Sequence, residues 1–242
     1  MKIFFIRHAE SENNKNWFFH RDNTGRLTDP GISDLGQRQA GHLSTFLGEH
    51  LEEFDFTRMY ISPFLRTLQT AAAFEQLYDV PKTVWTPIHE GGACFEIDAE
   101  TNEHIGDPGM GRSEIMKKFP NFSVSEEIDE SGWWKGAGSE PRYTRSYRAN
   151  LVLARLIEEF GQTDEHIALV SHGGFHNHFI NAILGISRPN GYWFEAQNTG
   201  ITCCVYGPER GNDFNPKEWR IEYANRSEWL PRNAQRDWFG YS

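Results

Sequence analysis

The sequence predicts an α/β fold: a three-layer α/β/α sandwich with a mostly parallel central sheet, an antiparallel edge and a cap insertion. Short apolar runs rich in β-forming residues alternate with longer segments of helical periodicity, which is typical of parallel strands joined by crossover helices. Two of these runs, at 3–6 and 166–170, are followed within two residues by a histidine. The length of 242 residues suits one large domain, and 38% hydrophobic residues are enough for its core.

The charge and the cysteines narrow the class of protein. The chain has 34 acidic and 24 basic residues and a net charge of −10, which argues against binding to nucleic acid or to an anionic membrane. An anionic substrate would therefore need positive charge concentrated in one pocket. Cys94, Cys203 and Cys204 have no zinc spacing and no even disulfide framework, which favours a reducing compartment. We expect Cys203 and Cys204 to face opposite sides of a sheet.

The N-terminus and the apolar runs predict the location. The run at 3–6 is too short for a signal peptide, and charged residues follow it at once. No apolar run approaches the roughly 18 residues of a membrane span. We therefore expect a cytoplasmic protein without a membrane partner; the sequence leaves the oligomeric state open.

The first strand is predicted at 3–6 and ends in Arg7 and His8. Polar residues that follow a strand lie at the carboxyl edge of the sheet, where ligands bind in open α/β folds. Arginine offers a planar fork of donors for phosphate oxygens, and histidine can act as nucleophile, base or acid near neutral pH. The pair suggests phosphoryl chemistry. Residues 16–28 are expected to form a polar and aromatic loop, in which Trp17 is a candidate for packing over the pocket.

The next elements continue the alternation. Residues 29–36 carry turn and N-cap signals, and apolar residues follow at helical spacing from Ala40 to Leu51. Residues 56–61 read as a second strand. Ser62-Pro63 then begins a helix on which Arg66, about one turn in, looks back over the strand end.

A third strand at 83–85 leads to a possible acid. Glu90 follows this strand and precedes Gly91 and Gly92, where the backbone can bend freely, so its carboxylate could reach the same site. The neighbouring His89 is an alternative proton donor.

Residues 92–139 have a looser pattern, with acidic residues, glycines and a short helical piece. We interpret them as a cap or insertion within a single domain of residues 1–242, because they are too short and too polar to hold a core of their own. Trp133 and Trp134 are candidates, with Trp17, for lining a substrate pocket.

The C-terminal half repeats the arrangement of the first strand. A helix at 147–160, with Leu151 expected inside, precedes a strand at 166–170 that ends in Ser171-His172-Gly173-Gly174. A helix from 175 to 184 follows, and the free N–H groups at its start suit phosphate. Parallel strands would bring His8 and His172 to one edge. Residues 193–206 and 218–223 are read as further strands.

A zinc site is the alternative for the second histidine motif. His172, His176 and His178 include a pair with the i, i+4 spacing that can bind zinc on a helix. The spacing contains no carboxylate and no third ligand with a clear pattern. We therefore predict no metal site, with His176 and His178 as ordinary helix residues, one half-buried and one exposed.

Five segments, taken together and in order, resemble one family. They are Arg7-His8-Ala9-Glu10-Ser11-Glu12-Asn13-Asn14, residues 32–40, the Ser-Pro-x-x-Arg segment at 62–71, Glu90, and Ser171-His172-Gly173-Gly174. The chain with these motifs is similar to the histidine phosphatase superfamily, in the branch that includes the cofactor-dependent phosphoglycerate mutases. The family usually has glycine where this chain has Ala9.

The resemblance implies a role for each matching residue. His8 would attack phosphorus and become a phosphohistidine, while Arg7, Arg66 and His172 hold the equatorial oxygens. Asn14 and Gly173 would assist in binding the phosphate. Glu90 would protonate the leaving alcohol and then deprotonate the attacking water, for which its proton affinity should be raised. Neither metal nor cofactor is needed, because the arginines supply the positive charge.

The resemblance therefore predicts a hydrolase, a phosphomonoesterase of the histidine acid phosphatase type acting on a small phosphorylated metabolite. A phosphotransferase of the phosphoglycerate mutase type is the first alternative, although the stretch after Glu90 does not resemble the mutases' long substrate-binding insert. A non-catalytic module that binds a phosphorylated ligand is the second, and the intact set of site residues argues against it.

Overall fold

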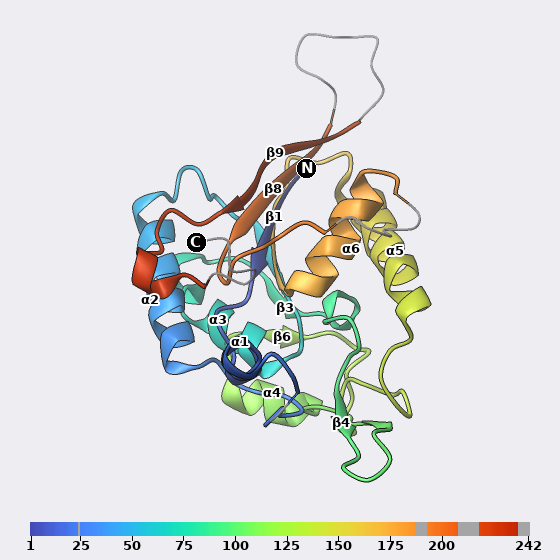
Figure 1. Cartoon of the computed structure of the whole chain (residues 1–242). Coiled ribbons are helices and arrows are strands. Elements are labelled where there is room, and N and C mark those ends of the chain that lie inside the picture. Colours follow the sequence, from blue (N-terminus) through green and yellow to red (C-terminus); the bar gives the residue numbers. More distant parts are fainter. Residues whose placement is uncertain (24, 187–192, 208–217, 237–242) are drawn as a thin grey trace.

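The computed structural model describes residues 1–23, 25–186, 193–207 and 218–236. Its main sheet has seven strands in the order β6-β3-β2-β7-β1-β8-β9 (Figure 1). Their bounds are β1 Lys2–Arg7, β2 Arg58–Ile61, β3 Lys82–Val84, β6 Ser123–Val124, β7 His166–Ser171, β8 Ile201–Gly207 and β9 Glu218–Arg226. The first five strands in this order are parallel, and β8 and β9 add an antiparallel edge. The predicted α/β fold is confirmed.

Helices cover both faces of this sheet (Figure 1). Their bounds are α1 Glu12–His20, α2 Asp34–Glu49, α3 Leu65–Ala72, α4 Arg112–Lys118, α5 Arg142–Phe160 and α6 Gly173–Ile183, with short 3-10 turns at Glu75–Leu77, Thr86–Ile88 and Arg232–Ala234. Helices α2 and α3 pack on one face, and α5 and α6 on the other. None of the helices in the described part of the chain is long and apolar enough to cross a bilayer.

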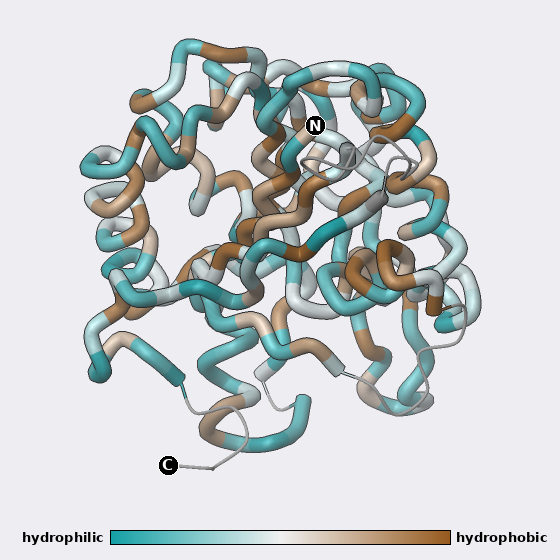
Figure 2. Tube along the Cα trace, turned by 90° about the horizontal axis from the view of Figure 1, so that it is seen from above, coloured by the Kyte–Doolittle hydropathy of each residue, from teal (hydrophilic) through white to brown (hydrophobic). Residues whose placement is uncertain are grey.

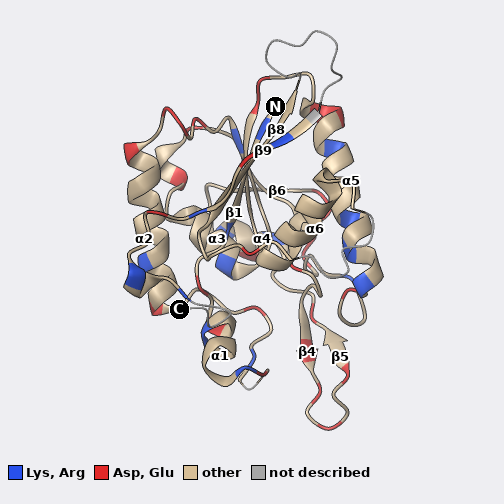
Figure 3. Cartoon of the chain, turned by 45° about the horizontal axis from the view of Figure 1, so that its top comes forward, with Lys and Arg blue, Asp and Glu red and all other residues tan. Residues whose placement is uncertain are grey.

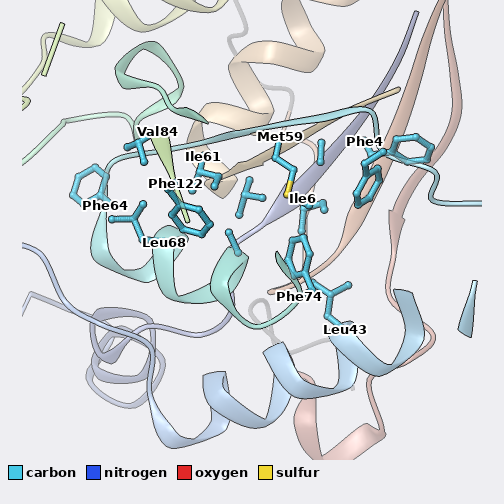
Figure 4. Packing of buried hydrophobic residues seen from close by; sticks show 14 of the residues in the cluster. Phe4, Ile6, Leu43, Met59, Ile61, Phe64, Leu68, Phe74, Val84 and Phe122 are labelled. Carbon is cyan, nitrogen blue, oxygen red and sulfur yellow. The ribbon is translucent and has the colours of Figure 1, made fainter. Parts of the chain in front are cut away.

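The alternation of side chains along β1 builds a core on each face of the sheet. Phe4 and Ile6 pack with α2 and α3 (Figure 4), whereas Ile3 and Phe5 pack with α5 and α6. A strand that is buried on both faces reads as a continuous apolar run, as this one does. Hydrophobic stretches accordingly gather in the middle of the molecule (Figure 2). Cys203 and Cys204 lie in opposite cores, as predicted.

The register of two neighbouring strands places the predicted histidines together. Strands β1 and β7 are parallel, and Arg7 stands opposite Ser171. His8 and His172 are each one residue further along, at adjacent carboxyl ends. The sheet thus brings together two residues that are far apart in the sequence.

Three local predictions are wrong. Residues 16–20, the first part of the expected loop, belong to helix α1. This helix buries no side chain and so has no apolar periodicity; a capping box between Ser11 and Asn14 starts it instead. Residues 193–200 are not in a strand. Helix α5 begins five residues earlier than predicted, and its buried face uses Val152 and Leu153 while Leu151 is 52% exposed.

Residues 92–139 share the main core. They contain the hairpin of β4 (Phe95–Ile97) and β5 (His104–Gly106), which projects from the body (Figure 3), then α4 and the edge strand β6. Cys94, Ile115 and Trp133 are buried in the same cluster as α2 and α3. The segment is therefore anchored to the sheet through its own apolar side chains.

Candidate active site

His8 is buried and its ring is held in one neutral form. Its ring is 2% exposed, and Nδ1–H donates to the carbonyl oxygen of Ala9 at 2.6 Å. This bond fixes the tautomer, so Nε2 carries the lone pair and accepts a hydrogen bond from Arg66 Nε at 3.2 Å. Burial lowers the pKa of His8 well below its ordinary value, and the charges of Arg66 and Arg7 lower it further. Attack on phosphorus would require a neutral imidazole of this kind, with its lone pair released from Arg66.

Arg66 lies against His8, as its place on α3 predicted. It is 8% exposed, its guanidinium packs 4.0 Å from the centre of the Phe64 ring, and Nη1 is 3.9 Å from Asp29 Oδ1. Asp29 also accepts hydrogen bonds from the backbone N–H of Leu65 at the start of α3. The second arginine, Arg7, has a pKa that burial lowers to about 10, so it remains charged at neutral pH.

His172 lies beside His8, with 5.1 Å between the ring centres. The hydroxyl of Ser62 is 2.7 Å from Nε2, and burial lowers the pKa of His172 well below its usual value. Its buried Nδ1 has no hydrogen-bond partner among the described residues. An unsatisfied buried nitrogen is costly, and it suits a group that a ligand oxygen will meet.

Glu90 caps the N-terminus of α6. Its carboxylate accepts hydrogen bonds from the backbone N–H groups of Gly91, Gly174 and Phe175 at 2.6, 3.2 and 3.1 Å. A Cβ at Gly174 would lie 2.3 Å from Glu90 Oε1, so only glycine permits this approach. These three N–H donors hold the carboxylate of Glu90 at the start of α6.

The alternative acid, His89, is poorly placed. It is 3% exposed, packs against Trp133 and Trp134, and donates from Nδ1 to the carbonyl oxygen of Glu90 at 2.8 Å. Burial lowers its pKa to about 3, with a further contribution from Arg148. His89 is buried, stays neutral and does not line the cavity, whereas Glu90 does, which favours Glu90 as the proton donor.

Asparagines connect the two sides of the site. Asn14 accepts a hydrogen bond from Asn198 Nδ2 at 3.1 Å, and the same Nδ2 donates to the carbonyl oxygen of His8 at 3.0 Å. Asn198 was not predicted, because it lies on an irregular segment without a motif. The departure at Ala9 is accommodated: its φ is not positive, and its N–H donates to Thr70 Oγ1 at 3.0 Å.

A cavity of about 690 Å³ opens beside these groups. The predicted residues that line it are Arg7, Asn14, Trp17, Glu90 and Gly173. Unpredicted lining residues are Gly91, Arg145, Gly174, His178, Trp193, Glu195 and Ala196. His8, Arg66 and His172 are buried and are not part of the lining. Trp133, which was a candidate, is 2% exposed and belongs to the core, and Trp134 does not line the cavity either.

The residues that follow His8 contact the C-terminal segment. Glu10 is fully buried and accepts hydrogen bonds from Ser33 Oγ at 2.7 Å and from Arg236 Nε at 2.5 Å. Arg236 Nη2 adds a longer contact of 3.3 Å, so the guanidinium approaches the carboxylate with both nitrogens. This contact between a buried carboxylate and a half-buried guanidinium holds the turn that follows His8.

The second histidine motif is not arranged for a metal. His176 is buried with Nε2 2.9 Å from Thr202 Oγ1, and His178 is half-buried with Nδ1 3.0 Å from Ser146 Oγ. The expectation that one of them is exposed is therefore wrong. Within the described ranges, no group of three or more His, Cys, Asp or Glu side chains could hold a metal ion.

Asp29 makes the stability of the fold depend on pH. Burial raises the pKa of Asp29 to about 6, against the opposing effect of Arg66. Because the pKa of this carboxyl is higher in the folded than in the unfolded protein, the folded state binds the proton more tightly. The free energy of unfolding therefore falls as pH rises from about 4 through 6. We expect Asp29→Asn to raise the free energy of unfolding by about 1–3 kcal/mol at pH 8 and to leave it unchanged near pH 3.5. Urea unfolding at both pH values measures this, and a variant less stable at pH 8 would contradict it.

Comparisons with known proteins agree with this geometry. A family model described as the histidine phosphatase superfamily, branch 1, matches residues 3–219. The solved structure of a phosphoserine phosphatase mutant from Entamoeba histolytica in complex with phosphoserine is 19% identical, with a TM-score of 0.55 over 95% of this chain and 99% of that one. A mycobacterial glucosyl-3-phosphoglycerate phosphatase in complex with VO3 is 20% identical, with a TM-score of 0.57 over 93% and 99%. A comparison with curated proteins finds no significant match.

Proposed function

Because the chain belongs to branch 1 of the histidine phosphatase superfamily, we propose that it is a metal-independent phosphatase that hydrolyses monoesters of small phosphorylated metabolites through a phosphohistidine at His8. One observation carries the proposal. The neutral His8 has its Nδ1–H fixed on the carbonyl oxygen of Ala9 and its Nε2 lone pair beside Arg66.

The first half of the reaction transfers the phosphoryl group to His8. The negative phosphate draws the guanidinium of Arg66 away from Nε2, which frees the lone pair, and Arg7 and His172 share the remaining oxygen charge. The Nε2–P bond forms as the P–O bond to the alcohol breaks. Positive charge that develops on the ring is stabilised by the hydrogen bond to Ala9. A proton from Glu90 reaches the leaving oxygen, so the alcohol departs neutral.

The second half returns the enzyme to its starting state. Glu90, now ionised, accepts a proton from a water molecule while the water oxygen attacks phosphorus. The P–N bond breaks, its electrons return to Nε2, and inorganic phosphate leaves. The N–H groups of Gly91, Gly174 and Phe175 stabilise the carboxylate between the two halves, so Glu90 changes protonation state without leaving its place.

Two further observations support small phosphorylated molecules as substrates. The cavity of about 690 Å³ has the size of a small-ligand site and concentrates arginine side chains on an acidic protein. The solved structures that share the fold include enzymes named for phosphoserine and for glucosyl-3-phosphoglycerate.

The test measures phosphate release from a panel of phosphate monoesters by the purified protein in the presence of EDTA. Turnover that resists the chelator is expected, together with a phosphoprotein that survives alkali and is lost in acid, as a phosphohistidine is. Transfer of the phosphoryl group to an added phosphoglycerate instead of water would identify a mutase. Binding of esters without turnover or phosphoprotein would identify a non-catalytic module.

A further inference from the structure

One cation in the cavity wall has no role in the proposed reaction. Arg145 lies on α5, a helix that carries several basic residues (Figure 3), and it lines the cavity. Its only hydrogen bond among the described residues runs from Nη2 to the carbonyl oxygen of Glu140 at 3.2 Å. The buried Nε has no hydrogen-bond partner in that part of the chain. The guanidinium therefore keeps unused donors.

The nearest carboxylate does not neutralise Arg145. Glu140 accepts two hydrogen bonds of 2.8 Å from Arg148, in the bidentate arrangement that suits a guanidinium and a carboxylate. Arg145 Nε is 3.9 Å from the same carboxylate, beyond hydrogen-bond distance. Glu140 thus makes its hydrogen bonds to Arg148, and the donors of Arg145 stay available to a ligand.

The position of Arg145 relates it to the leaving group. A Cβ at Gly91 would lie 3.1 Å from Arg145 Cδ and 3.2 Å from Nη1, so the guanidinium packs directly on the residue after Glu90. Glu90 is the group that meets the ester oxygen in the proposed reaction. An anion held by Arg145 would therefore belong to the alcohol part of the substrate, close to the ester oxygen.

We infer that Arg145 selects phosphate monoesters whose leaving group carries a second anionic group, a carboxylate or a phosphate, close to the ester oxygen. The inference rests on the proposed function, because Glu90 defines the leaving-group side. Trp17 and Trp193 line the same cavity and offer apolar surface to the rest of the alcohol. Arg7 and Arg66 remain available for the transferred phosphate.

The test measures binding rather than turnover. In His8→Ala protein, which cannot form the phosphohistidine, calorimetry compares two matched pairs of esters. Glycerol 3-phosphate and 3-phosphoglycerate differ by a carboxylate, and fructose 6-phosphate and fructose 1,6-bisphosphate differ by a phosphate. The same titrations follow with Arg145→Met, which keeps the packing on Gly91, with Arg145→Lys, and with Arg142→Met as a control on an exposed arginine of the same helix.

The expected result is that, in at least one pair, the ester with the second anionic group binds roughly 10- to 100-fold more tightly than the ester without it. Arg145→Met removes this preference and leaves the affinity for the ester without the second group unchanged. Arg145→Lys retains part of the preference, and Arg142→Met retains all of it. The pair that shows the preference identifies the anion as carboxylate or phosphate.

Three outcomes would overturn the inference: equal affinity for both members of each pair, equal weakening of both members by Arg145→Met, or no binding of any ester. The second would assign Arg145 to the transferred phosphate or to the fold. Failure of the proposed function looks different. If the protein shows the expected preference for the second anionic group but hydrolyses no ester, the role of Arg145 stands and the proposal of a phosphatase fails.

Discussion

Replacing His8 with alanine is expected to lower kcat/KM for every phosphate monoester by about 10⁴-fold or more and to abolish the phosphoprotein. The reason is that Nε2 of His8 provides the only lone pair that Arg66 and the Ala9 carbonyl oxygen prepare for attack. Binding by the arginines survives the substitution but cannot replace the covalent intermediate. Initial rates, and labelling reactions stopped with an alkaline denaturant, measure the effect in the two proteins.

Two controls separate lost chemistry from a lost fold. His20→Ala changes an exposed histidine at the end of α1 and should leave kcat/KM within twofold of the wild-type value. The thermal midpoint of His8→Ala should show a folded protein, because the ring is a buried group without a charge partner. Retention of a tenth of the wild-type activity in folded His8→Ala would contradict the phosphohistidine route.

Replacing Arg236 with methionine is expected to lower the free energy of unfolding by about 3–5 kcal/mol. Among the described residues, the substitution leaves Ser33 as the one side-chain partner of the Glu10 carboxylate, which is buried in the native protein. Removing the partner of a buried carboxylate costs far more than the ion pair itself contributes, because the remaining charge is poorly solvated. Urea unfolding at pH 7 measures the change.

The double variant Glu10→Gln/Arg236→Met tests that reason. It removes the buried charge together with its partner and should recover most of the stability that Arg236→Met loses. Arg232→Met, an exposed arginine in the same C-terminal segment, should change the free energy of unfolding by less than about 0.5 kcal/mol. A double variant as unstable as Arg236→Met would show that packing, and not the unpaired charge, sets the loss.

The parts of the fold that were predictable are those in which burial imposes a period. Strand β1 is buried on both faces, and helix α2 is buried on one, so each has the apolar pattern of its class. Helix α1 has no buried side chain, and the signals for it in the sequence are its capping residues, Ser11 at the N-cap and Asn14 three residues later. Attention to that cap would have found the helix.

The candidate site divides in the same way. Residues at strand ends, such as His8 and His172, were predictable because parallel strands end at one edge. Arg145 was missed because the start of α5 was placed at Tyr147, which put this arginine in a loop; Pro141 immediately before the helix was the available signal. Trp193 and Glu195 lie on an irregular segment, and no local pattern says that such a segment returns to the cavity.

The site has two parts, one held by the register of β1 and β7 and one made of side chains that line the cavity. His8 and His172, which are proposed to act on the phosphoryl group, follow β1 and β7, and the ladder between these strands sets their positions. The side chains proposed to face the alcohol line the cavity from α1, α5, α6 and residues 193–196. Evolution or engineering can therefore replace the side chains that line the cavity, and so change the ester that the proposed enzyme accepts, while His8 and His172 keep their positions.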